Sequence, residues 1–325
     1  MKKVSVLYIP LFLSLIYFIY FSKIESLALS LFLLTVGCFV LIKGSDFFIE
    51  GAVGIAARLG MSEHSIGITV VAFGTSLPEL AISGLASYQG HTETAWGNVI
   101  GSNVTNIFLV LGLAMIIIIK PSKFALKDSI SMLIISFITI FLALDGTLQF
   151  YDGIFLISFY IIFLYMLKRR KMEEERKTTL SFSLITFLFI LGVFGVAVGA
   201  EAMVRGAVSI AEFLGVREAV IAASIVAFGT SLPELATSIT AAFKKHPGIA
   251  VGNVIGSNVV NLSLVLGLAA VLRSISISLL SPAIAFFIFA TIITPLVLKK
   301  QWIGKKMGIA FICFYAIFII FLYLI

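Results

Sequence analysis

The sequence predicts an all-α polytopic membrane protein, built from two inverted five-helix repeats (ten core transmembrane helices) plus one extra N-terminal transmembrane helix. Three observations predict this fold class. Of the 325 residues, 60% are hydrophobic and 12% are charged, whereas soluble domains carry about 25% charged residues. Apolar runs of membrane-spanning length recur from one end of the chain to the other. A long stretch of the first half also returns in the second half.

The basic residues indicate membrane topology and not a nucleic-acid partner. The net charge is +7, but the lysines and arginines lie in short clusters between apolar runs, as topology determinants do. The two cysteines, Cys38 and Cys313, lie inside apolar runs without metal-ligand spacing, so we expect small buried hydrophobic residues and no disulfide framework. The expected surroundings are the lipid bilayer, and no cofactor or obligatory protein partner is evident.

Eleven apolar segments are candidate spans, and the first of them stands apart. It follows Lys2 and Lys3, is longer than the apolar region of a usual signal peptide and precedes no cleavage site, so we expect an uncleaved extra span. The candidate spans are 4–21, 26–48, 64–88, 96–119, 129–144, 151–167, 180–200, 218–242, 249–271, 279–298 and 307–325. The corresponding units are the extra helix 1–24, the first repeat 25–167, a linker 168–179 and the second repeat 180–325.

The distribution of lysine and arginine predicts the orientation of these spans. With a cytoplasmic N-terminus and alternating spans, 18 of the 23 basic residues lie on the cytoplasmic side and only Lys23, Arg217 and Arg273 on the other. This asymmetry fits the positive-inside rule. We therefore expect a cell-membrane protein whose N-terminus and 168–179 linker are cytoplasmic and whose C-terminus lies outside.

The internal repeat becomes visible when the sequence is shifted by 155 residues. Residues 71–87 then match 226–242 at 13 of 17 positions, and 97–113 match 252–268 at 14 of 17. Each repeat contains five predicted spans, and because five is an odd number the two halves enter the membrane from opposite sides. Inverted repeats are typical of secondary transporters, whose substrate site lies near the midplane at broken helices.

The repeated motif GTSLPE places a glutamate, Glu79 or Glu234, inside each apolar segment. Its proline removes a backbone donor and clashes with the carbonyl four residues earlier, where a glycine allows the helix to kink or open. A carboxylate at the midplane costs roughly 2.5–3.5 kcal/mol on insertion scales and is functional by default. A single glutamate could instead be paired structurally or lie at the interface, but two copies in an inverted repeat favour an ion site.

The oxygen atoms of this motif predict which ions would bind. Carbonyl, hydroxyl and carboxylate oxygens are hard ligands that suit Na⁺, Ca²⁺ and Mg²⁺ and do not suit soft metals. The two carboxylates together balance the charge of one divalent cation. The further oxygen donors come from the carbonyls and hydroxyls of Ala72, Thr75, Ser76, Ala227, Thr230 and Ser231.

The second repeated motif, GNVIGSN, adds serine and asparagine side chains. Asn98, Ser102 and Asn106 share one face of a helix. Ser102, Asn106 and their repeat mates Ser257 and Asn261 are the stronger candidates for the site, a preference that rests in part on the family resemblance given below. Hydrogen bonding between packed helices is the competing role for such residues. That role is a serious alternative for the other asparagines, which are Asn98, Asn103, Asn253 and Asn258.

The other ionisable residues favour structural or solvated positions. Asp46, Glu50, Glu201 and Arg205 lie toward helix ends, where interfacial placement or a structural pair is expected, and Glu201 and Arg205 are spaced to pair along one helix. The three histidines are at span ends, where we expect solvated loops. They are His64, His91 and His246.

The paired GTSLPE and GNVIGSN motifs resemble the α-repeats of the calcium/cation antiporter superfamily, and within it the prokaryotic Na⁺/Ca²⁺ exchanger family. The resemblance covers about residues 26–325. It implies ten spans in two inverted repeats, exchange of Ca²⁺ for Na⁺ by alternating access, and sliding of the first helix of each repeat against an ion-binding core. It also implies a central Ca²⁺ site made by the carboxylates of Glu79 and Glu234 and the carbonyls of Thr75 and Thr230. The implied Na⁺ ligands are Ala72, Thr75, Ser76 and Ser102 in one half and Ala227, Thr230, Ser231 and Ser257 in the other, with Asn106 and Asn261 completing the middle.

The chain departs from this family pattern in two places. Many members carry Asp where this chain has Asn261, so its core holds two carboxylates and not three, as H⁺-coupled relatives also do. The extra N-terminal span is the other departure. The leading hypothesis is a Ca²⁺/Na⁺ antiporter, and the alternative is an H⁺/Ca²⁺ antiporter. A passive cation channel is less favoured, and an enzyme is disfavoured because no Ser/His, Cys/His or HExxH arrangement accompanies the glutamates.

Overall fold

The protein is a bundle of helices, as expected from its composition. The computed structural model describes residues 2–21, 26–117, 122, 124–168, 180–215, 227–277 and 282–324. In these residues, eight helices are long and apolar enough to cross a membrane, or nine if one bent pair is a single span. The all-α membrane fold is therefore confirmed. The eighth predicted span, 218–242, begins outside the described residues, so they do not decide the count of eleven.

The two strands β1 (Thr147–Leu148) and β2 (Ile275–Ser276) pair antiparallel and join two loops at one end of the bundle. The helices are α1 (Lys2–Phe21), α2 (Leu27–Leu59), α3 (Glu63–Ile66), the π-helix η1 (Gly67–Val71), α4 (Ala72–Thr75), α5 (Leu77–Gln89), α6 (Thr92–Thr105), the π-helix η2 (Asn106–Leu111), α7 (Gly112–Ile117), α8 (Ala125–Leu142), the 3-10 helix η3 (Ala143–Asp145), α9 (Phe150–Lys168), α10 (Phe182–Phe213), α12 (Ala227–Gly229), α13 (Leu232–Phe243), α14 (Pro247–Val260), the π-helix η5 (Asn261–Val265), α15 (Leu266–Leu272), α16 (Pro282–Lys299) and α17 (Lys305–Leu324).

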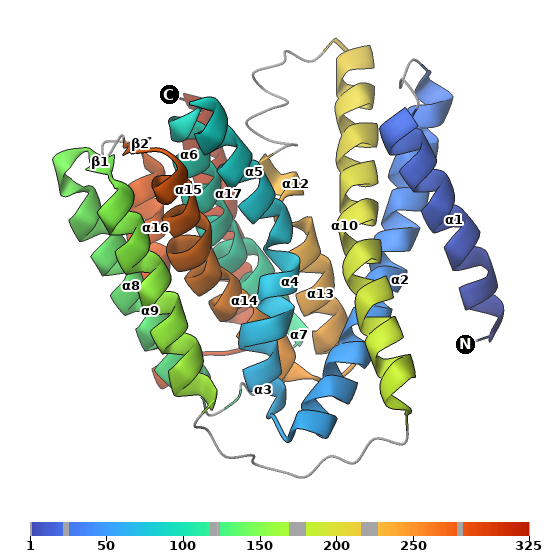
Figure 1. Cartoon of the computed structure of the whole chain (residues 1–325), viewed down its shortest axis with the longest axis horizontal. Coiled ribbons are helices and arrows are strands. Elements are labelled where there is room, and N and C mark those ends of the chain that lie inside the picture. The colour runs from blue at the N-terminus through green and yellow to red at the C-terminus, as the bar shows by residue number, and fades with distance from the viewer. Residues whose placement is uncertain are drawn as a thin grey trace.

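The longest helices, α2 and α10, pack along each other on one side of the bundle and run in opposite directions (Figure 1). Both are longer than the predicted spans 26–48 and 180–200, because the helices continue through charged residues beyond the apolar runs. Helix α2 ends where Gly60 adopts a left-handed conformation, with φ 66°, and donates its N–H to the carbonyl of Ala56. Such a glycine is a common helix C-cap.

Glycines allow these two backbones to meet. A Cβ added to Gly199 of α10 would lie 2.5 Å from the backbone nitrogen of Leu41 in α2, and one added to Gly192 would collide with the backbone of Phe48. Close approach through small residues is how helices associate in lipid, where burying apolar surface gives little driving force. The pair is therefore held by backbone-to-backbone contact that no larger residue permits.

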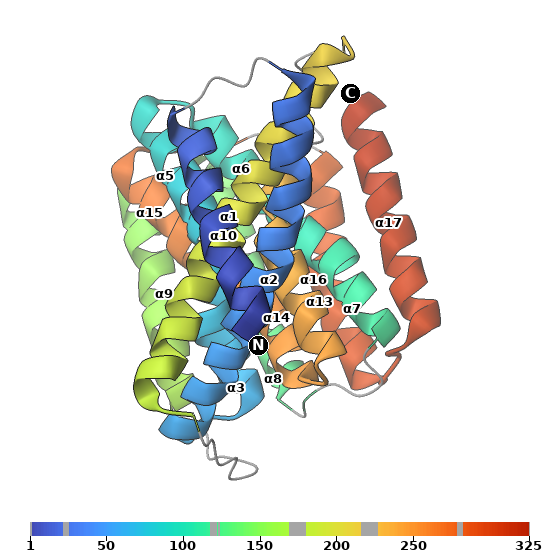
Figure 2. The same cartoon turned by 90° about the vertical axis from the view of Figure 1, so that its right-hand side faces the viewer.

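Helix α1 covers the outer face of this pair (Figure 2). The ring of Tyr8 lies 5.0 Å from the ring of Phe47 in an edge-to-face contact, and Tyr8, Leu15 and Ile19 are buried against α2 and α10. Arg205 of α10 donates to the backbone carbonyl of Ile19 at 3.0 Å. The predicted N-terminal segment is thus a helix packed against the bundle.

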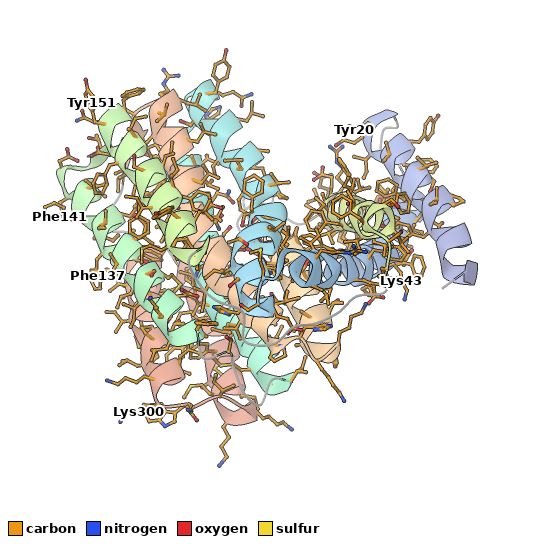
Figure 3. The ribbon with its side chains drawn as sticks, turned by 60° about the horizontal axis from the view of Figure 1, so that its bottom comes forward. Tyr20, Lys43, Phe137, Phe141, Tyr151 and Lys300 are labelled. Carbon is orange, nitrogen blue, oxygen red and sulfur yellow. The ribbon has the colours of Figure 1, made fainter. Side chains whose placement is uncertain are left out.

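The opposite side of the molecule presents apolar side chains outward. Phe137, Phe141 and Tyr151 project from α8 and α9, far from Tyr20 and Lys43 on α1 and α2 (Figure 3). Their exposure is expected of residues that face lipid. Cys313, predicted to be buried, is also exposed, and Cys38 is partly exposed. In a membrane protein an apolar residue need not be buried, because the lipid surrounding it is equally apolar.

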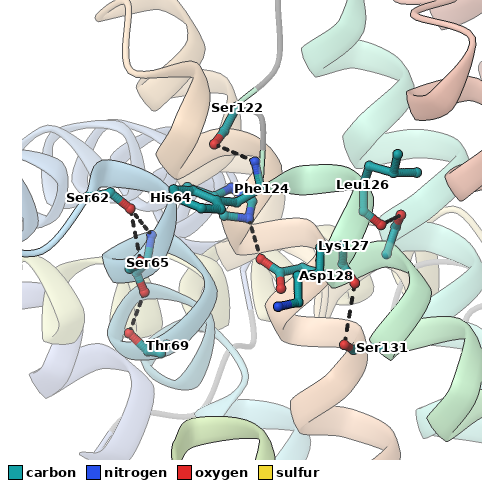
Figure 4. Close-up of polar contacts among 11 residues, drawn as sticks. Ser62, His64, Ser65, Thr69, Ser122, Phe124, Leu126, Lys127, Asp128 and Ser131 are labelled. Atoms are coloured by element: carbon teal, nitrogen blue, oxygen red, sulfur yellow. Dashed lines mark hydrogen bonds and ion pairs between the residues drawn. The ribbon is translucent and has the colours of Figure 1, made fainter. Parts of the chain in front are cut away.

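Two histidines are placed differently from the sequence-based expectation. His64 is 1% exposed and its Nε2 lies 2.8 Å from a carboxylate oxygen of Asp128, so α3 is joined to α8 (Figure 4). His246 lies 2.7 Å from Glu63 and is also partly buried. The expectation of solvated loops was wrong for both, because each imidazole ring pairs with a carboxylate group of a neighbouring helix. The third histidine, His91, is exposed as expected.

Replacement of Gly192 by leucine should separate α2 from α10. The new side chain would collide with the backbone of Phe48, and overpacking of this kind costs about 1–3 kcal/mol or more. Thermal unfolding of the purified protein in detergent should show a clearly lowered midpoint. The matched control is Gly84→Ala in α5, where the nearest atom to a new Cβ is 4.0 Å away. An unchanged midpoint for Gly192→Leu would contradict this packing.

Candidate functional site

Both GTSLPE motifs interrupt their helices at the serine. Helix α4 ends and α5 begins at Ser76, whose ψ of 8° is not helical, and the two segments of this span are bent by 46°. The same break separates α12 from α13 at Ser231, with ψ 3°. Pro78 and Pro233 occupy the first positions of the new helices, where a missing N–H costs no hydrogen bond. The predicted kink is thus a full break that starts a new helix.

The backbone just before the first break remains hydrogen-bonded. The carbonyl of Ala72, predicted to be free, accepts hydrogen bonds from the N–H of Ser76 at 3.1 Å and from the hydroxyl of Thr75 at 3.2 Å. An ion that binds this carbonyl oxygen would therefore share it with two hydrogen-bond donors. For the repeat mate Ala227, the structure describes the backbone only.

The GNVIGSN motifs form two fourteen-residue helices, α6 and α14, and each continues directly into a π-helix. The π-helices begin at Asn106 and at Asn261, which are repeat mates. A third π-helix, η1, precedes the first GTSLPE motif. These wider turns were not predicted, because propensity does not identify them; they occur often at functional sites.

The two glutamates are completely buried and close to one another. Glu79 and Glu234 are both 0% exposed, and their carboxyl groups are near enough to interact electrostatically. The hydroxyl of Ser76 donates to one oxygen of Glu234 at 3.0 Å, and the hydroxyls of Thr75 and Ser257 also lie beside this carboxyl group. Both oxygens of Glu79 have no hydrogen-bond partner.

Hydroxyl groups connect the two halves in repeat-related pairs. The Oγ1 of Thr75 lies 3.4 Å from the Oγ of Ser257, and the Oγ of Ser102 lies 3.4 Å from the Oγ1 of Thr230. Thr75 also donates to the side-chain oxygen of Asn253 at 3.1 Å. Each half therefore contributes one threonine hydroxyl and one serine hydroxyl to contacts with the other half.

Buried polar atoms without a partner concentrate at the same place. Among the described residues, they include one oxygen of Glu234, the hydroxyl of Ser231, the side-chain oxygen of Asn106 and both polar side-chain atoms of Asn261. Buried polar atoms are nearly always hydrogen-bonded in folded proteins, so an unpaired cluster needs an explanation such as a bound ion. Most of these atoms are oxygens, which are the ligands that Na⁺ and Ca²⁺ prefer.

Ten of the twelve predicted site residues are thus buried, with an exposed fraction of 2% or less. An eleventh, Thr230, is 7% exposed. Two asparagines assigned to packing also reach the site, since Asn253 accepts from Thr75 and Asn258 accepts from Asn106 at 3.2 Å. Asn98 does hold neighbouring helices together, donating to Ser83 at 2.9 Å, and Asn253 does the same to Ser238 at 2.9 Å. The strict repetition of these asparagines was the signal for their second role.

Most of the chain matches one protein family. The family described as Sodium/calcium exchanger protein matches residues 29–168 and 184–324. The chain is 37% identical to Uncharacterized membrane protein MJ0091 of Methanocaldococcus jannaschii, over 86% of this chain and 94% of that protein. It is 30% identical to Sodium/calcium exchanger MaX1 of Methanosarcina acetivorans, over 90% of this chain and 97% of that protein.

Solved structures of the sodium-calcium exchanger NCX_Mj resemble this one closely. A structure soaked with 10 mM Na⁺ and 10 mM Sr²⁺ has a TM-score of 0.82 and 35% sequence identity, covering 90% of this chain and 98% of that chain. A structure soaked with 10 mM Na⁺ and zero Ca²⁺ has a TM-score of 0.83 at the same identity and coverage. The fold and the sequence thus point to the same relatives.

The two serines at the helix breaks should respond differently to alanine. Ser76→Ala removes the donor to buried Glu234, which should cost about 1–3 kcal/mol of stability, whereas Ser231→Ala removes a hydroxyl that has no partner. Thermal unfolding in detergent without added Na⁺ or Ca²⁺ should therefore show a lowered midpoint for Ser76→Ala only. Equal midpoints for the two repeat mates would contradict the asymmetric hydrogen bonding.

Proposed function

This chain belongs to the sodium/calcium exchanger protein family, and we propose from that membership and from its site that it exchanges Ca²⁺ for Na⁺ across a membrane. It is a multi-pass integral membrane protein and a transporter, not an enzyme. Its relatives include Sodium/calcium exchanger MaX1, and a related structure of the sodium-calcium exchanger NCX_Mj was soaked with Na⁺ and Sr²⁺.

The observation that carries this function is the pair of buried carboxyl groups with unpaired oxygens, Glu79 and Glu234. Two carboxylates compensate the charge of one Ca²⁺, and Ca²⁺ takes six to eight oxygen ligands in flexible geometry. Two Na⁺ ions carry the same charge and also prefer oxygen ligands. A site of this composition can therefore hold either ion in turn, which is what exchange requires.

The ligands that we propose are those implied by the family resemblance, transferred by motif position. The central Ca²⁺ would take the carboxylates of Glu79 and Glu234 with the carbonyls of Thr75 and Thr230. The unpaired side-chain oxygens of Asn106 and Asn261 support a place for both residues in the middle of the site. The flanking Na⁺ ligands would be Ala72, Thr75, Ser76 and Ser102 from one half and Ala227, Thr230, Ser231 and Ser257 from the other.

The architecture that suits this function is an inverted repeat. We propose ten core spans in two repeats, 25–167 and 180–325, joined by the linker 168–179 and preceded by the helix of residues 1–24. The opposite directions of α2 and α10 support this arrangement, as do the matched helix breaks at Ser76 and Ser231. Alternating access would follow from movement of α2 and α10 against the helices that carry the ligands.

The orientation in the membrane follows from the basic residues. The N-terminus, the end of α9 and the start of α10 lie at one end of the bundle, and the C-terminus lies at the other (Figure 1). We propose that the first end is cytoplasmic, because 18 of the 23 basic residues belong to it in the alternating topology.

Neutralising either carboxyl group should abolish exchange. In Glu79→Gln and Glu234→Gln the site loses half its charge, and the loss of one buried charge from a pair costs about 2–5 kcal/mol, roughly thirtyfold or more in Ca²⁺ affinity. The measurement is uptake of radiolabelled Ca²⁺ by proteoliposomes that contain a Na⁺ gradient. Glu93→Gln, which changes an exposed acid, is the matched control. Full transport by either site variant, in monodisperse protein, would refute the site.

The driving ion is tested in the same proteoliposomes. An imposed Na⁺ gradient at equal pH should drive Ca²⁺ uptake, because the site offers Na⁺ several neutral oxygen ligands beside the two carboxylates. A pH gradient without Na⁺ should drive little uptake. Uptake that follows only the pH gradient would contradict Na⁺ coupling, and uptake without any counter-ion would indicate a channel.

A further inference from the structure

An ion-pair cluster fastens α2 to the opposite half of the molecule at the end that contains Lys244. Lys244, at the C-terminal end of α13, lies 3.1 Å from a carboxylate oxygen of Asp46 in α2 and also donates to the backbone carbonyl of Asp46 at 3.1 Å. Lys43, one turn earlier in α2, lies 3.1 Å from the other carboxylate oxygen. Asp46 thus joins two cations, and one of them belongs to a helix of the ligand-bearing core.

The repeat offers an internal comparison for this cluster. With the offset of 155, Asp46 corresponds to Glu201 of α10, and Lys244 corresponds to Gln89 at the end of α5. Glu201 pairs with Arg205 of its own helix at 2.6 Å, and Arg205 in turn donates to the carbonyl of Ile19 in α1. The acid is therefore retained in both halves, but the cation that would bridge to the core is present in one half only.

Other polar contacts strengthen the same end. Glu63 with His246 joins α3 to α14, and His64 with Asp128 joins α3 to α8 (Figure 4). The repeat mate of Asp128 is Ala283, which has no charge. Of these contacts, Asp46–Lys244 and His64–Asp128 are not duplicated in the sequence of the other half, whereas Glu63 and His246 correspond to Glu218 and His91.

At the other end, the space beside α10 is open. A cavity of about 430 Å³ lies between α1, α5, α10 and the second helix break, and it reaches from Glu201 and Tyr20 to Thr230. Ala200 also lines this cavity, and its repeat mate is Ser45, which is completely buried beside Asp46. Ala200, which is 4% exposed, thus borders this cavity, whereas its mate Ser45 is 0% exposed.

We propose that the Asp46–Lys244 ion pair is a latch that keeps the site closed at the Lys244 end, while the cavity beside Glu201 opens the other end. The proposal rests on the proposed function, because it assumes that α2 and α10 move together against the core. Movement that exposes Ser45 must separate Asp46 from Lys244, and it must close the cavity beside Ala200. The latch therefore favours the state seen in this structure.

The expected strength of the latch is modest. Asp46 and Lys244 keep 29% and 35% of their side-chain surface exposed, and exposed ion pairs change an equilibrium by about two- to fivefold. A modest latch suits a transporter, because the closed end must also open in every cycle. Loss of the latch should therefore shift the populations of the two states without unfolding the protein.

The test measures the exposure of two repeat-related cysteines. In a background in which Cys38 and Cys313 are replaced by alanine, Ser45→Cys reports opening at the Lys244 end and Ala200→Cys reports the cavity. The labelling rate with a water-soluble maleimide is measured on purified protein in detergent. Lys244→Gln, which introduces the residue found at the mate position 89, and Asp46→Asn should each raise labelling at 45 and lower labelling at 200 by about two- to fivefold.

The controls separate a latch from general loosening. Glu201→Gln, at the mate of Asp46, should leave labelling at 45 unchanged, and the charge reversal Asp46→Lys with Lys244→Asp should restore the original rates. If Ser45→Cys does not fold, the expected decrease in the labelling rate of Ala200→Cys still tests the proposal. Unchanged rates at 200 in Lys244→Gln and Asp46→Asn, or an equal shift with Glu201→Gln, would overturn the proposal.

The same variants distinguish this proposal from the proposed function. Labelling reports conformation and requires no transported ion, so the latch could fail while Na⁺-driven Ca²⁺ uptake persists. Conversely, absence of Ca²⁺ uptake in the unmodified protein, with latch-dependent labelling intact, would reject the exchange function and leave the conformational role of Asp46 and Lys244.

Discussion

The structure depends on one constraint, which is that two carboxyl groups lie fully buried and close together in an apolar bundle. Neither Glu79 nor Glu234 has enough protein donors to compensate burial, since both oxygens of one and one oxygen of the other lack a partner. Unpaired charge is expensive in such surroundings. The surrounding chain departs from regular helix wherever it approaches these groups: both GTSLPE segments break, and both GNVIGSN helices widen into π-turns. These departures bring oxygen atoms, not apolar side chains, to the carboxyl pair.

Around this centre, some contacts follow the repeat and others do not. Gly153 meets Gly267, and their mates Gly308 and Gly112 meet in the same way, so the helices α9 and α17 are attached by equivalent contacts. The paired hydroxyls that join the two halves also follow the repeat. In contrast, Ser76 donates to a glutamate while its mate Ser231 does not. The repeat-related contacts belong to the permanent framework, and the others describe one conformation of a protein that must adopt at least two.

Helix α1 is attached to one part of the structure, the α2–α10 pair. It lies outside the residues that match the family and packs on the α2–α10 pair, with Arg205 attached to the carbonyl of Ile19. It also forms one wall of the cavity that reaches Thr230. An addition to the family fold is therefore placed on the helices that are proposed to move and beside the open end of the site.

The sequence by itself determined the membrane fold and the family, and it predicted the residues of the candidate site. An apolar chain leaves few places for a carboxylate, and exact repetition of a motif containing Gly, Pro and Glu identifies those places without coordinates. Helix ends were predicted less well, because α2 and α10 continue through charged residues that a hydropathy limit excludes.

Only the tertiary structure decided which groups meet across the halves. The contacts of Asn253 with Thr75, of His64 with Asp128 and of Asp46 with Lys244 join residues far apart in the chain, and no local pattern encodes such a pairing. The difference between the two ends likewise requires the structure, since a repeat predicts symmetry and a transporter in one state must break it.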